Sequence, residues 1–541
     1  MTNLANAIQS KIKGEVLSDA KVRDYYSTDG SIFTITPKHV VFPSDVKDIS
    51  QVVKTLNNNA KVSKKIGLTV RGKGTDQAGG ALGDGVVMVM PAHHYHLLKV
   101  TPTHVRVQPG AIYGDLQQIL NQHGRYLPCY PSSIAYCTIG GAVANNACGE
   151  HTVKYGSTRD YTESLQIVLS NGEVITTRRL SARQLAQKKK LNTFEGKIYR
   201  ELDHLITYNI RKINEAPPHV TKNSAGYDLW DVKRPDGSFD LTPLIVGSQG
   251  TLAVVSEIVL RTEPMPSDTS LIRVNFKDLT QAGEAAEKLR ALNPSALELV
   301  DHHLLEFLQA TNPGRVAEFV GNGMPAVMFL VEFDDKSAWR RKQKVIKALK
   351  ILRHITKDIE VVHDPINIQR LWRIRRSAAA IIWKSKTKAK ALPIIEDAAV
   401  PVGQFVPFLK NAYKLFDTHK IKFAVWGHAG DANFHIQPFF DLAKKSDQIK
   451  LFKVVEEFYS MVIAMGGTTA GEHNDGRLRA PFLPQLYGQD MYQLFKQVKD
   501  IFDPTGIMNP GVKIDVTMED VKLLTRQEYS MSHLGTDGLE S

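Results

Sequence analysis

The chain has 541 residues, 43% of them hydrophobic, which is enough to bury large cores in roughly two to four domains. Its 68 Lys and Arg residues outnumber its 56 Asp and Glu residues, and the net charge of +12 favours anionic partners such as small carboxylates. No zinc-finger pattern and no aromatic-rich RNA-binding pattern accompanies the basic residues, so we expect no nucleic-acid-binding role.

The cysteines and the N-terminus bear on the cellular location. Cys129, Cys137 and Cys148 lie in one short region, and without a secretory leader they are better interpreted as small buried thiols than as disulfides or zinc ligands. No apolar run is long enough to cross a bilayer. We therefore expect a cytoplasmic protein, and peripheral contact with the inner membrane stays open as an alternative.

Residues 1–80 are predicted to contain a strand–helix–strand unit that ends in a glycine-rich loop. The strand Val40–Phe42 is followed by a helix that begins at Val46 and by a second strand, Leu68–Val70. The loop Arg71–Gly80 offers bare backbone N–H groups and positive charge, as a phosphate site requires. Its glycine spacing matches neither a dinucleotide-binding Rossmann motif nor a P-loop, and an ordinary loop is about as well supported.

A run of small residues, Pro131–Gly149, has hardly any bulky polar side chain. Such a segment packs closely against a large flat group, to which its hydroxyls and amides can hydrogen-bond. The run follows the predicted strands Val86–Met90 and Val105–Ala111. It precedes the strand Leu165–Leu169, which turns at Ser170–Glu173 into a hairpin.

Residues from about 265 to 400 show a repeated strand–helix–strand pattern. We expect an antiparallel sheet backed by helices. Two further helices, 449–465 and 490–501, are predicted to pack around it, and the polar residues beyond about 525 are expected to fray. The predicted strands are Leu271–Phe276, Ala296–Val300 and Ala326–Phe333, and the predicted helices are Thr280–Leu292 and Ser337–Leu352.

The densest basic runs are Arg340–Arg353 and Lys384–Lys390. Each is most simply a solvated helix face or a loop. The first run is also compatible with a membrane surface or an acidic electron carrier.

The stretch Trp426–His435 carries two histidines on either side of a Gly-Asp turn signal. In one unbroken strand an offset of seven would place His428 and His435 on opposite faces, so we predict a strand–turn–strand that brings both toward one point. A second glycine-bounded loop adds Glu472 and His473. His428, His435 and Glu472 suit a divalent metal. His473 is then free to take a proton, and a hydrogen-bonded structural role for each histidine is the competing interpretation.

Three segments occur in the order found in flavoproteins of the vanillyl-alcohol-oxidase type: Arg71–Thr75, the small-residue run and Leu244–Leu252. They resemble the FAD-binding (PCMH-type) domain of that family. The resemblance implies an α+β fold, with a two-part FAD-binding domain over residues 1–262 and a tail over 516–541. Between them, an α+β cap or substrate domain over 263–515 would have an antiparallel sheet and C-terminal helices, and its end would return to the FAD domain. Non-covalent FAD contacts are implied for Arg71, Gly72, Gly74, Thr75, Ser132, Ser133, Thr138, Gly140, Gly141, Asn145, Gly149 and Asn509.

The C-terminal part is similar to the D-2-hydroxyacid dehydrogenase branch of these flavoproteins, which includes D-lactate, glycolate and D-2-hydroxyglutarate dehydrogenases. The resemblance covers roughly residues 20 to 515, nearly the whole chain. The motifs that carry the similarity are Gly427–His435, Gly471–His473, and Phe502–Gly511 with Lys513.

The similarity implies a role for each of five residues. His428, His435 and Glu472 would hold zinc, manganese or iron, and His473 would be the base. Arg375, in a segment that resembles the carboxylate-binding one of the branch, would bind the substrate carboxylate. The expected reaction is metal-assisted hydride transfer from a D-2-hydroxyacid to flavin, which forms the 2-oxoacid and passes electrons to a cytochrome, a quinone or another flavoprotein.

Departures from the branch bear on the substrate. Ile395 aligns with the lysine of hydroxyglutarate-specific enzymes, so a second substrate carboxylate would lack a partner, and D-lactate is the expected substrate. The alternatives are glycolate or D-2-hydroxyglutarate dehydrogenase, an oxidase that uses O₂, and a flavin-binding scaffold subunit of a larger oxidase complex. Asn474 and Ala432 stand where the branch usually has glycine. No cysteine cluster for an iron–sulfur module follows in this sequence, so we expect electrons to leave by another route.

Overall fold

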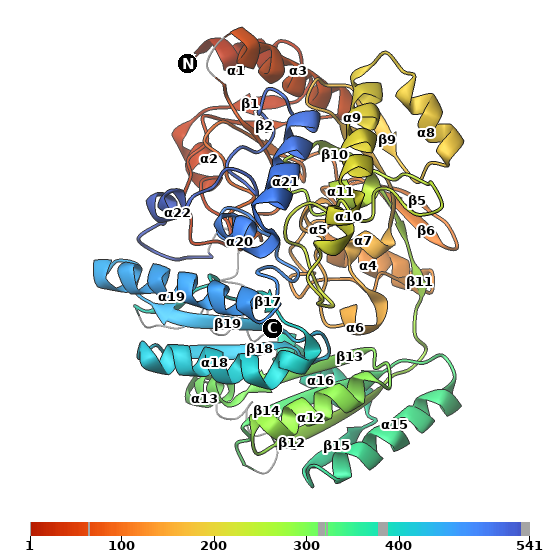
Figure 1. Cartoon of the computed structure of the whole chain (residues 1–541), viewed down its shortest axis with the longest axis vertical. Helices are drawn as coiled ribbons and strands as arrows, with labels where there is room; N and C mark the ends of the chain where they lie inside the picture. The colour runs from red at the N-terminus through yellow and green to blue at the C-terminus, as the bar shows by residue number, and fades with distance from the viewer. Residues whose placement is uncertain (1, 63–64, 312–319, 321–322, 377–387, 532–541) are drawn as a thin grey trace.

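The computed structural model describes residues 2–62, 65–311, 320, 323–376 and 388–531. Two layered bodies lie one above the other in Figure 1, and the lower one is formed by Ser270–Ala464. The last part of the chain crosses back to the upper body. No helix among the described residues is long and apolar enough to cross a membrane.

The upper body contains a mixed sheet made of β1 (Glu15–Leu17), β2 (His39–Phe42), β3 (Leu68–Arg71) and β4 (Val86–Val89). Its strand order is β1-β2-β4-β3, and β2 and β3 both run parallel to β4. The crossover helix α3 (Val46–Val62) buries Ile49, Val52 and Leu56 in the core beside this sheet. The glycine-rich loop begins where β3 ends, which confirms the predicted strand–helix–strand unit.

A second sheet, antiparallel throughout, is made of β5 (Leu97–Val100), β6 (His104–Val107), β8 (Thr162–Val168), β9 (Val174–Thr177) and β10 (Val254–Arg261). Its strand order is β5-β6-β10-β8-β9. The predicted β8–β9 hairpin is confirmed, and its turn has Gly172 at φ 86°, a conformation that favours glycine. Side chains of this second sheet form a hydrophobic core together with three helices. These helices are α4 (Tyr113–Gln122), α5 (Ile139–Asn145) and α9 (Phe194–Tyr208).

The three cysteines lie in the upper body as free, buried thiols, which confirms their interpretation from the sequence. Burial raises the pKa of Cys129 to about 11 and that of Cys137 to about 12. Thiols with such pKa values stay protonated at neutral pH and behave as small apolar side chains.

The lower body is built on one large antiparallel sheet made of β12 (Ser270–Phe276), β13 (Ala296–Asp301), β14 (Val327–Phe333), β15 (Ile359–Val362), β16 (Lys390–Ala391), β17 (Ala398–Ala399), β18 (Phe423–His428) and β19 (Asn433–Phe440). The strand order is β15-β12-β14-β13-β18-β19-β16, and β17 also pairs with β19. The antiparallel sheet expected from residues 265–400 is confirmed. It is larger than that repeat suggested, because the β18–β19 hairpin joins its edge.

Helices cover both faces of this sheet (Figure 1). Because side chains alternate along a strand, Leu297 and Leu299 of β13 enter the core on one face, whereas Val300 enters the core on the other, with Glu298 on that side too. The side chains of the candidate site come from this second face. The first face is covered by α12 (Leu279–Arg290), α15 (Ala338–Arg353), α18 (Phe405–Thr418) and α19 (Lys445–Ala464), and the second by α13 (His302–Thr311) and α16 (Pro365–Arg376).

After α19 the chain returns to the upper body. Helix α21 (Gln489–Phe502) buries Leu494 and Phe495 in the core that also contains α9. The loop 471–477 precedes this helix and therefore lies where the chain crosses between the two bodies.

The described end of the chain is packed rather than frayed. The backbone N–H of Arg526 donates to the carbonyl of Ile32 at 2.9 Å, and the Tyr529 hydroxyl donates to the carbonyl of Gly30 at 2.9 Å. Tyr529 is buried. The expectation of fraying beyond about 525 is therefore wrong up to residue 531, because these residues cover the upper body, and residues 532–541 lie outside the described part of the chain.

Candidate active site

The two histidines of the Trp426–His435 stretch lie on one β-hairpin. β18 and β19 pair with Trp426 opposite His435 and with His428 opposite Asn433. The turn is a short 3-10 helix, Ala429–Asp431. In this register His428 and His435 are diagonal neighbours on one face of the sheet. The predicted strand–turn–strand is confirmed.

Three acceptor atoms of this site converge on one point. Nε2 of His428 and Nε2 of His435 lie 3.3 Å apart, and each lies 3.2 Å from Oε1 of Glu472. The other ring nitrogens are already bound: Nδ1 of His428 lies 2.7 Å from Oε1 of Glu298, and Nδ1 of His435 lies 2.7 Å from the backbone carbonyl of Glu396. Both partners accept hydrogen bonds, so each Nδ1 donates, and in the neutral imidazole each Nε2 keeps its lone pair for a ligand. Two imidazole nitrogens and a carboxylate oxygen facing one point fit a divalent cation.

Buried charges around these ligands control their protonation. Burial opposes the protonated form of His435, but hydrogen bonds to Glu396 and Glu472 raise its pKa to about 10. Burial also opposes ionisation of Glu472, but Lys222 and His428 hold its pKa well below the ordinary value. The nearby carboxylates attract both a proton and a divalent cation to Nε2 of His435. The two therefore compete for this nitrogen.

Charged side chains that sequence reasoning missed hold the ligands in place. Lys222, fully buried, lies 2.8 Å from Oε2 of Glu472. Glu396 accepts hydrogen bonds from Arg479 and fixes the neighbouring imidazoles, as Glu298 fixes His428. Glu298 interrupts one apolar stretch, and Glu396 with Asp397 interrupts another, a signal that the sequence contained. Lys222 lies in a polar stretch and has no such signal.

His473 is the most exposed of the predicted catalytic and metal-binding side chains. Its side chain is 23% exposed, against 7% for His428 and 6% for His435. Its Nδ1 lies 2.7 Å from Oε2 of Glu396, and its Nε2 lies 3.5 Å from Oε1 of Glu472. Burial lowers the pKa of His473, but the surrounding carboxylates, Glu396 first, raise it above the ordinary value. With Nδ1 donating to a carboxylate, Nε2 is the nitrogen that can take a proton.

Arg375 lies beside His428 because both bind the same carboxylate. Its Nη2 is 2.5 Å from Oε2 of Glu298, and its buried Nε has no hydrogen-bond partner in the described part of the chain. The next residue, Arg376, pairs with Glu150 of the upper body and lies over the Tyr130 ring. The end of α16 is therefore clamped against the upper body, with Arg375 turned toward the candidate metal ligands.

A pocket in the upper body lies between the glycine-rich loop and α5. A Cβ on Gly72 would lie 2.4 Å from Oγ1 of Thr138, and a Cβ on Gly140 would lie 2.5 Å from Cβ of Pro109, so glycine is needed at both positions. Lys73 adds positive charge to the pocket wall. None of the described lining residues is a histidine or a cysteine, which fits a non-covalent ligand. The predicted FAD contacts that line it are Gly72, Gly74, Thr75, Thr138, Gly140, Gly141 and Asn145.

The other five predicted FAD contacts lie outside this pocket wall. Arg71 is buried and donates to the carbonyl of Thr28 at 2.8 Å, and Asn509 donates to the carbonyls of Gly80 and Gln249, so both hold the loops that shape the pocket. The backbone carbonyl of Gly149 lies 3.4 Å from Nζ of Lys222, at the metal side of the site. The remaining two, exposed and partly exposed respectively, are Ser132 and Ser133.

The candidate metal ligands and the FAD pocket are neighbours. The side-chain amide of Asn474 donates to the backbone carbonyl of Asn145 at 3.0 Å, and the backbone N–H of Gly476 donates to Oε1 of Gln249 at 2.9 Å. Asn145 and Gln249 both line the pocket. His473 directly precedes Asn474, so the candidate base lies next to the FAD pocket wall.

The two departures from the family pattern occupy left-handed backbone positions. Asn474 has φ 65° and Ala432 has φ 48°. Glycine adopts this conformation without strain, which explains its frequent use at both positions in the branch. In this chain the larger residues Asn474 and Ala432 adopt that conformation themselves.

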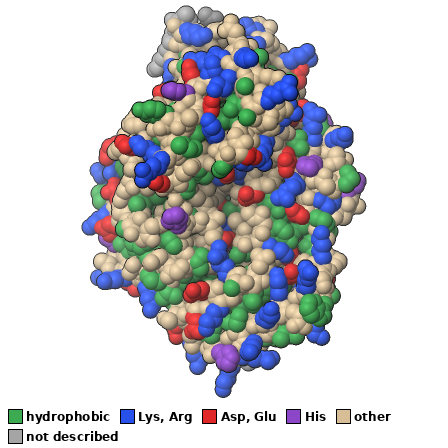
Figure 2. Space-filling view, turned by 45° about the vertical axis from the view of Figure 1, so that its right-hand side comes forward, with side chains coloured by type: hydrophobic (Ala, Val, Ile, Leu, Met, Phe, Trp, Pro, Cys, Tyr) green, Lys and Arg blue, Asp and Glu red, His purple; other side chains and the backbone are tan. Residues whose placement is uncertain are grey.

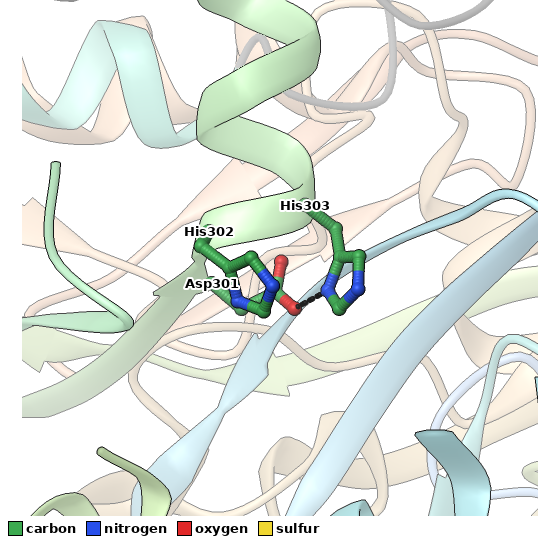
Figure 3. Close-up of side chains that lie close together, drawn as sticks. All are labelled: Asp301, His302 and His303. Carbon is green, nitrogen blue, oxygen red and sulfur yellow. Dashed lines mark hydrogen bonds and ion pairs between the residues drawn. The ribbon is translucent and has the colours of Figure 1, made fainter. Parts of the chain in front are cut away.

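A second group of possible ligands, Asp301, His302 and His303, lies at the junction of β13 and α13 (Figure 3). Oδ2 of Asp301 accepts from Nδ1 of His303 and from the Tyr413 hydroxyl, both at 2.7 Å. Its Oδ1 accepts from the backbone N–H of Leu304 at 3.1 Å, in the first turn of α13. These bonds describe a helix cap, so we assign no ligand to this group.

Two parts of the chain match known protein families. Residues 37–178 match the family described as FAD binding domain, and residues 265–512 match the family described as FAD linked oxidases, C-terminal domain. Among solved structures, the 4-ethylphenol oxidase from Gulosibacter chungangensis is similar with a TM-score of 0.69 at 15% sequence identity, over 96% of this chain and 98% of that one. This likeness concerns the fold.

The similar curated proteins are dehydrogenases and oxidase subunits. The D-2-hydroxyglutarate dehydrogenase of Escherichia coli is 27% identical over 517 residues, which cover 93% of this chain and 50% of that protein. Glycolate oxidase subunit GlcD of Bacillus subtilis is 26% identical over 88% of both chains. The mitochondrial D-lactate dehydrogenase [cytochrome] of Arabidopsis thaliana is 27% identical over 88% of this chain and 73% of that protein.

The chain thus spans about half the length of the D-2-hydroxyglutarate dehydrogenases that it matches. Along this chain the two matched families follow each other in the order of its upper and lower bodies. The chain belongs to the FAD-linked oxidase family, with an FAD-binding domain of the PCMH type followed by the family's C-terminal domain on its large antiparallel sheet.

Proposed function

We propose that the protein is an FAD-dependent dehydrogenase that oxidises a D-2-hydroxyacid to the 2-oxoacid. The observation that carries this proposal is the convergence of His428 Nε2, His435 Nε2 and Glu472 Oε1 on one point beside the FAD pocket. An ion held there suits a substrate with adjacent hydroxyl and carboxylate oxygens. Electrons would leave to an external acceptor: a cytochrome, a quinone or another flavoprotein.

Two groups would be held by the residues described above. His428, His435 and Glu472 would hold zinc, manganese or iron, which when bound supplies Lewis-acid polarisation of a hydroxyl oxygen. The pocket wall around Gly72 and Gly140 would hold FAD, which when bound supplies a two-electron acceptor.

The protein's own side chains orient the substrate and move its proton. His473 takes the hydroxyl proton at Nε2, and Glu396 keeps the imidazole in the required tautomer through its bond to Nδ1. Arg375 binds the substrate carboxylate through the N–H groups that Glu298 leaves free. The His428 and Arg375 side chains stay in fixed relation because Glu298 binds both.

We propose a dicarboxylate, D-2-hydroxyglutarate, as the preferred substrate. D-lactate was expected because Ile395 would face the substrate, but Ile395 is fully buried in the core on the opposite face of the sheet. Arg375, at the end of α16, keeps a buried Nε without a partner in the described part of the chain, and the adjacent Arg376, paired with Glu150, adds positive charge nearby. D-2-hydroxyglutarate dehydrogenases are among the similar proteins over more than nine-tenths of this chain. D-lactate and glycolate are the second candidates, because proteins named for them match at nearly the same identity.

The scaffold alternative predicts a flavoprotein without turnover of its own. The complete set of His428, His435, Glu472 and His473 argues against it, because a scaffold does not require buried metal ligands beside a candidate base.

The test is anaerobic reduction of the purified, FAD-loaded chain. D-2-hydroxyglutarate, D-lactate and glycolate are added separately, with and without prior chelator treatment, and the visible flavin absorbance is followed. We expect D-2-hydroxyglutarate to bleach the flavin fastest, chelator to abolish bleaching, and Mn²⁺ or Zn²⁺ to restore it. A flavin that no hydroxyacid bleaches would leave only the scaffold role, and bleaching insensitive to chelator would remove the metal from the proposal.

A further inference from the structure

The outward face of α15 carries large apolar side chains that no described residue of the chain covers. Trp339 is 69% exposed and Ile346 is 48% exposed. They are seven residues apart, close to two helical turns, so they lie on one stripe. The opposite stripe, with Val345, Ala348 and Leu352, is buried in the core of the lower body. The helix is therefore anchored without Trp339 and Ile346.

The same face is strongly basic. Residues 336–357 contain nine Lys and Arg residues and no Asp or Glu. Two of them are used at the flank of the helix: Arg341 pairs with Asp268, and Lys344 lies 3.0 Å from Asp335. Five others are exposed and form no side-chain ion pair within the described part of the chain: Arg340, Lys342, Lys347, Lys350 and Arg353.

The position of α15 leaves this face open. In Figure 1 the helix lies at the lower margin of the molecule, beside the edge strand β15 and far from the upper body. Figure 2 shows lysine and arginine side chains next to hydrophobic ones over the lower part of the molecule, the part to which α15 belongs. This face is convex, so it suits contact with a broad surface and not the enclosure of a small ligand.

We propose that the outward face of α15, with Trp339 and Ile346 among its five free basic side chains, binds an anionic lipid bilayer. Lysine and arginine are attracted to anionic headgroups, and tryptophan is favoured at the boundary between headgroups and acyl chains. A soluble acidic protein would be attracted by the charges but would leave the row of exposed apolar side chains unexplained. This proposal is independent of the proposed activity.

Vesicle co-sedimentation of the full FAD-loaded chain tests the proposal. The vesicles are either pure phosphatidylcholine or phosphatidylcholine with a quarter of phosphatidylglycerol, at low and at physiological salt. We expect binding to the anionic vesicles, weaker binding at higher salt, and little binding to phosphatidylcholine alone. Equal binding to both kinds of vesicle, or to neither, would overturn the proposal.

Two variants of α15 separate its charges from its apolar side chains. K342E/K347E/K350E is expected to weaken binding to anionic vesicles at least ~100-fold, since each basic residue near such a surface contributes roughly fivefold. W339A/I346A is expected to weaken it about 10-fold with the charge unchanged. All five positions are exposed, so both variants should keep the unfolding temperature and flavin spectrum of the parent chain.

A matched control removes the same number of charges elsewhere. K21E/K47E/K61E changes three exposed lysines of the upper body and should bind vesicles within about threefold of the parent chain once the smaller net charge is allowed for. If this control loses binding as strongly as the α15 variant, the attraction comes from net charge and the proposal fails. If W339A/I346A binds as the parent does, the apolar contact is absent and the bilayer is the wrong partner.

Discussion

Nζ of Lys222, from the upper body, lies 2.8 Å from Oε2 of Glu472, in the loop that follows the lower body, and both side chains are buried. The other oxygen of this carboxylate faces His428 and His435. Lys222 therefore orients Glu472 and links the upper body to this loop at the candidate metal centre. Its removal should affect the metal and the stability together.

Lys222→Met should weaken metal binding about 10- to 100-fold, the usual effect of losing a partner that orients a ligand. It should also lower the free energy of unfolding by about 3 kcal/mol, because Glu472 loses a buried counter-charge. Metal per chain after dialysis and denaturant unfolding measure the two effects. Lys212→Met, which removes an exposed partner of Asp490, is the control and should change neither by a measurable amount. Full metal content in Lys222→Met would show that Glu472 binds the metal without being oriented by Lys222.

His473→Asn should lower kcat about 10²- to 10⁴-fold while FAD and metal stay bound, because the asparagine amide can still donate to Glu396 but cannot take the proton. His302→Asn alters the helix-cap group of α13 instead and should leave turnover and metal content unchanged. Steady-state kinetics, flavin absorbance and metal analysis on the same samples distinguish the two. A parent-like kcat in His473→Asn would assign the base elsewhere.

Gly140→Ala should weaken FAD binding, because its new Cβ would lie 2.5 Å from Cβ of Pro109 and 2.7 Å from the Pro109 carbonyl oxygen. Overpacking of this kind typically costs about 1–3 kcal/mol, which corresponds to roughly 5- to 150-fold in affinity if it falls on the bound state. FAD per chain after gel filtration gives the result. Gly403→Ala has open space around its new methyl group and should retain FAD fully.

The Glu150–Arg376 pair predicts a pH dependence of stability. Burial would raise the pKa of Glu150, but Arg376 and His151 hold it at about 2, below the ordinary 4.5. A carboxyl with a depressed pKa stabilises the fold above its unfolded pKa, so this contribution is complete above about pH 5 and is lost as the pH falls from 4.5 toward 2. The shift corresponds to about 3 kcal/mol.

Glu150→Gln should therefore lower the free energy of unfolding by about 3 kcal/mol at pH 7 and flatten its fall between about pH 5 and 3. Denaturant titrations at several pH values, compared with those of the parent chain, test this. Glu201→Gln removes an exposed partner of Lys197 and should leave the curve as it is. A Glu150→Gln curve parallel to that of the parent would show that the pair is not the source of the acid sensitivity.

The elements that the sequence predicted best are those whose signal is local. The odd offset between His428 and His435, with a Gly-Asp turn between them, was enough to predict the hairpin. Seven of the predicted FAD contacts line one pocket, because the glycine-rich loop and the small-residue run each carry their own composition. The tail was mispredicted, since the polar residues around Arg526 are held by backbone bonds to Ile32 that no local pattern reveals.

The local order of residues determined the family motifs, the hairpin and the three histidines predicted around Glu472, because turn chemistry and strand periodicity act over a few residues. Only the tertiary structure decided which charged side chains pair with these site residues. Lys222 and Glu472 are 250 residues apart, and Glu298 reaches His428 across 130. Such pairs form only when β13 and β18 become neighbours in one sheet and the chain returns from α19 to the FAD-binding domain. An unpaired charge is costly once it is buried. The packing of two distant segments therefore determines which charged side chains pair, and a local sequence pattern cannot predict this.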